Sequence, residues 1–157
     1  MTSSTSPATS VDHLALAVRI GENQHAILLA RIEEVLPALP IESVPQCLDF
    51  IRGVVFVRGH LIPVLDAAER LGLKNHQRPL EPHIVCLRVH NRLVGLEVDE
   101  ALDLVDLRHG VSVSADEIGA QRGFFTGVVE LDGNVFRLLD PDRLLADTEA
   151  VELDRVP

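Results

Sequence analysis

The sequence contains no tryptophan and no tyrosine, and it has only five phenylalanines, two cysteines and one methionine. Without Trp and Tyr, most of the side chains on which nucleic-acid bases stack are missing. Two cysteines are too few for the disulfide framework of a small secreted protein, and Cys47 and Cys86 stand among apolar residues. We therefore expect both to be small buried hydrophobic residues, in a core filled by Leu, Val and Ile.

Positive charge is also scarce. The 14 Lys and Arg residues face 24 Asp and Glu residues, which gives a net charge of −10 with His neutral. A protein that binds nucleic acid without sequence preference needs cations against the phosphates, so this balance argues against a nucleic-acid partner. No apolar run approaches the roughly 20 residues of a membrane span, and the N-terminus has no signal-peptide pattern. We expect a cytoplasmic protein that does not insert into a membrane.

Motifs that carry catalytic chemistry are absent from the sequence. The seven histidines show no metal-ligand spacing, the glycines are isolated turn formers, and no Gly-x-Ser-x-Gly motif occurs. Asp66 and Asp140 resemble a pair of catalytic carboxylates, but each follows a predicted strand and precedes a short helix, which favours a capping role. We expect no metal, no cofactor and no enzymatic activity.

The sequence repeats itself. Residues 124–145 lie over residues 50–71 without a gap, at an offset of 74 positions, and residues 83–105 resemble residues 14–36 more weakly at an offset of 69. Two copies of a β-rich unit are too few for a solenoid, and they predict two small barrels packed side by side. The matched pairs of the first repeat include Gly53 and Gly127, Gly59 and Gly133, and Asp66 and Asp140.

Turn and strand signals divide the chain further. We expect a disordered tail over 1–12, a first barrel over about 13–78, a second barrel over about 82–147 and a frayed tail over 148–157. The polar, Pro-bearing stretch Lys74–Pro82 is expected to join the two barrels. Residues 99–107 read as a strand or bent helix, and 108–123 as a long loop. Strands are expected at 13–20, 24–29, 53–57, 60–66, 83–89, 92–98, 127–131 and 134–139, with short helices at 67–72 and 140–145.

Arg58 stands out within the first repeated hairpin. Its partner in the repeat is Asp132, which with Gly133 forms a favoured hairpin turn. Arg accepts a positive φ less readily than Asp and adds five fixed donors at an exposed turn. Either a partner needs those donors, or the turn around Arg58 is of another type in which Arg costs nothing.

The pattern GVVFVRGHLIPVLDAAERLGL resembles the Arg-Gly signature of the CheW-like family of chemotaxis coupling domains. Upstream, HAILLARIEEVLPALPIESVP is similar to the strand, bend and Pro-rich edge of the family. Downstream, VGLEVDEALDLV is similar to its Gly-Leu-x-Val-Asp strand, and TGVVELDGNVFRLLDPDRLL to its closing hairpin and helix. The resemblance covers about residues 13–147. Three positions depart from the pattern: Phe56 replaces a common Asn, Val57 a usual Leu, and Pro141 a frequent Leu.

This resemblance implies a mainly β fold of two five-stranded SH3-like barrels with short helices. It also implies a non-catalytic adaptor, which joins the cytoplasmic tip of a chemoreceptor to the regulatory domain of a CheA-type histidine kinase. Receptor contacts of the family carry over to Arg58, Gly59, Gly53, Ile32 and Glu34. Its kinase contacts lie on apolar barrel ends and are not assigned to particular residues here.

Two other interpretations stay open at this point. One is a free-standing homologue of the kinase-regulatory domain, although the start at Met1 favours a complete small adaptor without a receiver domain. The other is a metal-dependent enzyme on a two-barrel scaffold, which would need polar residues clustered at one cleft.

Overall fold

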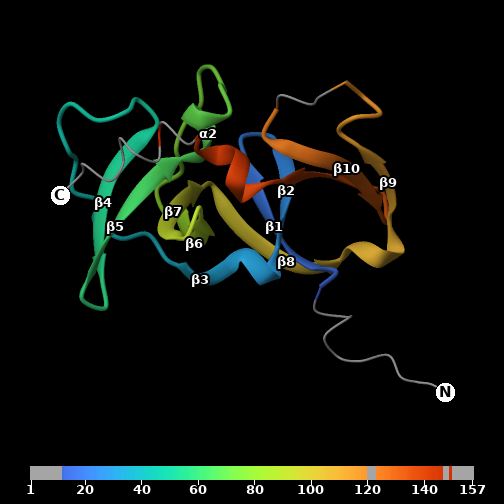
Figure 1. The fold of residues 1–157 in the computed structure, drawn as a ribbon, viewed down its shortest axis with the longest axis horizontal. Coiled ribbons are helices and arrows are strands. Elements are labelled where there is room, and N and C mark those ends of the chain that lie inside the picture. Colours follow the sequence, from blue (N-terminus) through green and yellow to red (C-terminus); the bar gives the residue numbers. More distant parts are fainter. Residues whose placement is uncertain (1–11, 120–122, 147–148, 150–157) are drawn as a thin grey trace.

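The structure is a computed structural model that describes residues 12–119, 123–146 and Glu149 (Figure 1). The predicted tails at 1–12 and 148–157 therefore lie outside the described residues, apart from Asp12 and Glu149. Within the described residues eleven strands form two sheets, which stand side by side in Figure 1. The strands are β1 (Leu14–Ile20), β2 (Asn23–Leu28), β3 (Ile32–Leu36), β4 (Ile51–Val57), β5 (His60–Asp66), β6 (His83–Val89), β7 (Arg92–Val98), β8 (Glu100–Asp106), β9 (Val111–Ser114), β10 (Phe125–Leu131) and β11 (Asn134–Leu139).

One sheet has the order β3-β6-β7-β5-β4, and because its strands are consecutive in the chain we call it the central barrel. A bridge between Glu42 and Val54 joins the chain beyond β3 to β4 and closes it. The other sheet, β8-β1-β2-β11-β10-β9, is the terminal barrel. It has six strands rather than the predicted five. The 3-10 helix η2 (Leu107–His109) ends β8, and the chain then forms a further short strand, β9, which pairs with β10.

The predicted barrel boundaries, 13–78 and 82–147, are wrong. The first hairpin, β1–β2, belongs to the terminal barrel, where β1 pairs with β8 and β2 pairs in parallel with β11. In the central barrel β6 pairs with β3, and β7 pairs in parallel with β5. Each half of the chain thus lends its first hairpin to the sheet of the other half. A repeat reveals which segments are equivalent, but it does not reveal which of them pair.

The repeat itself is present in the fold. Replacing each strand by its counterpart turns the order β3-β6-β7-β5-β4 into β8-β1-β2-β11-β10, which is the order found in the terminal barrel. Both matches, the strong one at 74 and the weak one at 69, therefore join structurally equivalent strands.

The largest hydrophobic core lies between the barrels. It contains Val18 and Ile27 of the terminal barrel together with Leu65 and Leu96 of the central barrel, all fully buried. A smaller core fills the central barrel, and a third, built mainly on three alanines and Phe136, fills the terminal barrel. Most of the hydrophobic stabilisation thus depends on the two barrels being together.

Most local predictions are confirmed. Asp66 caps α2 (Ala67–Arg70) by accepting a hydrogen bond from the Glu69 amide, and Asp140 accepts one from the Asp142 amide at the 3-10 helix η3 (Pro141–Leu144). The stretch 30–36 holds the end of η1 (Leu29–Arg31) and then β3. The loop predicted over 108–123 is wrong in part, because it contains β9. The strand reads Val-Ser-Val-Ser, an alternation that indicates a strand, but it is only four residues long and all four are exposed.

Candidate partner-binding surface

The turn at Arg58 has the same conformation as its repeat counterpart. Arg58 and Gly59 have φ angles of 48° and 82°, and Asp132 and Gly133 have 51° and 84°. Two successive positive φ angles are what a type I′ hairpin turn requires, so the alternative of a different turn type is wrong. An Arg in the left-handed region costs on the order of 1 kcal/mol, and such a cost is typical of functional positions.

The guanidinium of Arg58 reaches across to β3. Its Nη1 forms an ion pair with Oε1 of Glu34, although β3 and β4 stand at opposite ends of the sheet order. Closure of the central barrel brings the two edges together. The Arg58 side chain remains 71% exposed, so the pair contributes little to folding and leaves the guanidinium accessible to a partner.

The remaining predicted receptor residues differ in their surroundings. Gly59 follows Arg58 in the turn, and among the described residues other than its chain neighbours no heavy atom lies within 4 Å of the place where a Cβ would be. Ile32 begins β3, two residues before Glu34, and packs partly buried against the core between the barrels. Gly53 is buried at a bulge in β4, and a Cβ there would lie 2.1 Å from the carbonyl oxygen of Glu42. The structure therefore gives Gly53 a backbone role.

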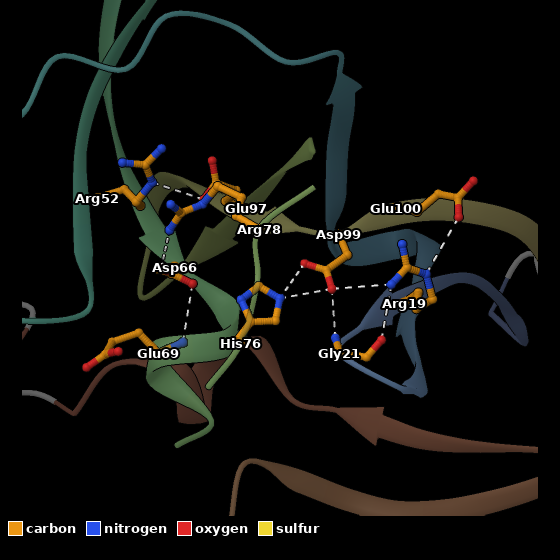
Figure 2. A network of polar contacts seen from close by, with 10 residues as sticks. All are labelled: Arg19, Gly21, Arg52, Asp66, Glu69, His76, Arg78, Glu97, Asp99 and Glu100. Carbon is orange, nitrogen blue, oxygen red and sulfur yellow. Dashed lines mark hydrogen bonds and ion pairs between the residues drawn. The ribbon is translucent and has the colours of Figure 1, made fainter. Parts of the chain in front are cut away.

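The sequence predicts that the stretch Lys74–Pro82 joins the two barrels, but it connects α2, which follows β5, to β6, and both strands belong to the central barrel. Buried carboxylates hold this stretch in place. Oε1 of Glu97 on β7 accepts from Nε of Arg52 at 3.0 Å and from Nε of Arg78 at 2.7 Å, and Arg78 also reaches Oδ2 of Asp66 at 2.6 Å (Figure 2). Glu97 is only 5% exposed, so each arginine partner offsets the cost of burying its charge. Arg78 thus links the carboxylates of β5 and β7 in the central barrel.

A second network fastens the same stretch to the terminal barrel. Asp99, which follows β7, accepts from the Gly21 amide at 2.8 Å and lies 2.8 Å from Nε2 of His76 (Figure 2). Arg19 approaches the same carboxylate at 3.4 Å. His76 and Asp99 line a polar cleft of about 490 Å³. Sequence reasoning missed this clustering, although an acidic pair inside the apolar run VGLEVDE was a usable signal for buried ion pairs.

The equivalent end of the terminal barrel is a hollow. Leu28, Thr126 and Asp140 are the repeat counterparts of Glu97, Arg52 and Asp66, and they line an apolar pocket of about 190 Å³. The repeat therefore places an ion-pair network in one barrel and a small cavity in the other.

Exposed apolar side chains gather on strands at two places. Phe56 and Leu61 stand opposite each other near the tip of the β4–β5 hairpin. On the terminal barrel, Val111 and Val135 flank Glu130 on the two neighbouring strands, and Val113 is also exposed. Exposed apolar groups of this kind are typical of protein contact surfaces.

Several groups have altered ionisation. Burial lowers the pKa of His25 to about 4, with a further contribution from the positive charge of Arg137. Burial also raises the pKa of the Cys86 thiol to about 11. The expected burial of the cysteines holds for Cys86, whereas Cys47 is half-buried, and both are free thiols.

The described part of the chain contains no group of three or more His, Cys, Asp or Glu side chains placed to hold a metal ion. Within the same residues no helix has the length and apolar character needed to cross a membrane.

Comparison with known proteins identifies the family. The family model for the CheW-like domain matches residues 14–149. The chain belongs to the CheW-like family. The resemblance found in the sequence is thereby confirmed.

Among its relatives, a probable chemotaxis protein CheW of Rhizobium etli is 26% identical over 141 residues, covering 88% of this chain and 91% of the relative. The chemotaxis protein CheW of Thermotoga maritima is 28% identical over 140 residues, covering 87% and 90%. The crystal structure of the scaffolding protein TtCheW from Thermoanaerobacter tengcongensis superposes with a TM-score of 0.77 at 18% identity, covering 88% and 95%. That likeness confirms the mainly β fold of two SH3-like subdomains.

Proposed function

We propose that this protein is a non-catalytic cytoplasmic adaptor that couples the tip of a chemoreceptor to the regulatory domain of a CheA-type histidine kinase. The observation that carries the proposal is the exposed, conformationally costly Arg58 turn with its Glu34 partner, on a chain of the CheW-like family. A fold-level analogy alone would not define a site, but a strained cation at an exposed turn has a physical reason to be there. No nucleic acid enters the proposal, because the chain is acidic.

The receptor surface is assigned to Arg58, Gly59 and Glu34, with Ile32 beside them and Gly53 shaping the hairpin from within. For the kinase, the exposed valines of the terminal barrel are the best-supported surface, because Val111, Val113 and Val135 offer apolar area to a barrel of similar shape. The two surfaces lie on different barrels, so one chain has room for both partners.

A binding experiment tests this proposal. The full chain is titrated by calorimetry with a chemoreceptor tip fragment and, separately, with the kinase regulatory domain from the same organism. Sedimentation of all three together then reports whether they form one complex. The expected result is binding to each partner and a ternary complex. Binding to neither partner would contradict the proposal, and binding to the receptor alone would favour a free-standing regulatory-domain homologue.

A further inference from the structure

The two matched hairpins differ at one exposed cross-strand pair. In β4–β5 the pair is Phe56 and Leu61, which are 71% and 55% exposed. In β10–β11 the equivalent pair is Glu130 and Val135. Val55 and Ile62, the neighbours of the first pair, belong to the core of the central barrel. Because side chains alternate along a strand, Phe56 and Leu61 lie on its outer face.

Glu130 has a structural task that Phe56 cannot perform. Its Oε2 accepts a hydrogen bond of 2.8 Å from the amide of Gly133, and this contact ties the strand to the turn. A phenyl ring offers no acceptor, and at 71% exposure it gains little from burial. The same hairpin also places Arg58, rather than an Asp, at a positive φ. Two stabilising features of the second hairpin are therefore missing from the first, at positions two residues apart.

We propose that Phe56, packed beside Leu61, is the apolar anchor that determines which partner docks at the Arg58 turn. The inference rests on the proposed function and extends it to the chemistry of the receptor. The fitting partner is a helix of the receptor tip that presents an aliphatic side chain to Phe56 and a carboxylate to Arg58.

Charge and composition both favour that partner. Aromatic residues and Arg are the side chains enriched at the energetic centres of interfaces, and here one of each lies on a single hairpin tip. The chain carries a net charge of −10, and Arg58 is an exposed cation within it that pairs with Glu34 and still presents guanidinium surface to a carboxylate of the partner. Where Phe56 stands, the resemblance gives a common Asn, so the aromatic ring distinguishes this chain within the family and is suited to discriminate between receptors.

The test compares Phe56→Glu and Phe56→Asn with the parent chain in calorimetric titrations against the chemoreceptor tip fragment. Phe56→Glu introduces the residue that the second hairpin already accepts, so it is expected to melt at or above the temperature of the parent. We expect both variants to bind the tip fragment roughly 10- to 100-fold more weakly. Binding to the kinase regulatory domain should stay within about twofold, because that surface is assigned to the other barrel.

Glu130→Phe is the matched control, since it places the same ring on the other hairpin and should leave receptor affinity unchanged. If the Phe56 variants bind the tip fragment within about twofold of the parent, this inference is wrong while the proposed function stands. If the parent chain does not bind the tip fragment at all, both the proposed function and this inference are wrong. A folding defect in Phe56→Glu leaves Phe56→Asn and Leu61→Thr to give the answer.

Discussion

The hairpins β4–β5 and β10–β11 show what this fold requires and what it leaves free. Both carry a glycine at a strand bulge, a turn with two positive φ angles, and an aspartate that caps the short helix that follows. They differ at the exposed tip, where the first has Phe56 and Arg58 and the second has Glu130 and Asp132. The shared residues fix the backbone conformation of the bulge, the turn and the helix start. The differing residues of the first hairpin weaken local structure, which is reasonable only if they serve a partner.

The two barrels also differ in the interior, at equivalent places near one end. In the central barrel Glu97 accepts hydrogen bonds from Arg52 and Arg78, and Asp66 accepts one from Arg78. In the terminal barrel the counterparts Leu28, Thr126 and Asp140 line a pocket. The stretch between the repeats supplies Arg78, so this connection is fastened to the central barrel by ion pairs. The two repeated units thus keep the same strand order, although one carries a network of ion pairs and the other a cavity at the equivalent place.

The largest expected effect comes from cutting the chain at the repeat boundary. A fragment of residues 1–78 contains β1–β5 but lacks β6 to β11, so it holds neither barrel complete. We expect no cooperative melting and poor NMR dispersion from this fragment alone, with recovery after mixing with residues 79–157. A fragment of residues 32–98 retains every strand of the central barrel and should be the better ordered of the two single pieces. Sharp melting of 1–78 by itself would show that the barrels do not exchange hairpins.

Substitution of Gly53 or Gly127, which the repeat matches, should have the second-largest effect on stability. An added Cβ at Gly53 meets the Glu42 oxygen at 2.1 Å with φ at 147°, and one at Gly127 meets the Val113 oxygen at 2.7 Å. Both obstacles are backbone atoms: Glu42 forms the isolated bridge to β4, and Val113 lies in β9, which pairs with β10. We expect Gly53→Ala to lower the free energy of unfolding by about 3 kcal/mol or more and Gly127→Ala by about 2 kcal/mol.

Gly59→Ala is the control for this pair, because its φ is positive but open space surrounds it; about 1 kcal/mol is expected. Chemical denaturation of the three variants measures the series. Equal stability of all three variants would contradict a role of the close approaches at Gly53 and Gly127.

His25 provides a smaller effect that depends on pH. Its counterpart in the other repeat is Val94, which is fully buried, and His25 itself is buried against Phe125 with its Nδ1 unpaired. The folded state holds the pKa of His25 at about 4, below the ordinary value of 6.5. The unfolded chain therefore takes up a proton more readily between these values. Stability is present in full above pH 6.5 and is lost as the pH falls toward 4, by up to about 3 kcal/mol.

The variant His25→Val should lose this part of the pH dependence. Denaturant midpoints of parent and variant at pH 7 and pH 4.5 test the prediction. Parallel losses in both proteins would assign the acid sensitivity to other groups.

The sequence predicted the repeats, the hairpins and the caps well, because each has a local signature such as Asp-Gly at a turn or Asp-Pro at a helix start. It did not predict the exchange of hairpins, because β1–β2 and β6–β7 have similar apolar patterns that fit either barrel. The Arg58–Glu34 pair was missed as a contact, although both residues were predicted site members, because barrel closure joins them from distant edges. The hydrogen bond from Arg78 to Glu97 was likewise not predicted, because no spacing in the sequence shows that these two residues meet in the fold.

In the proposed function the first hairpin alone is an interaction surface, although the second has the same backbone conformation at its turn. Exchanging the turn residues tests it most directly, with Arg58→Asp as the variant and Asp132→Arg as its matched control. Both variants should fold within about 1 kcal/mol of the parent, since each turn accepts the residue of the other.

The measurement is the affinity of each variant for a chemoreceptor tip fragment, with melting as the control. Arg58→Asp should lose on the order of 2–5 kcal/mol of binding free energy, or roughly 30- to 4,000-fold, because it replaces an attraction by a repulsion. Asp132→Arg should bind as the parent does. A folded Arg58→Asp variant with undiminished affinity would contradict the account.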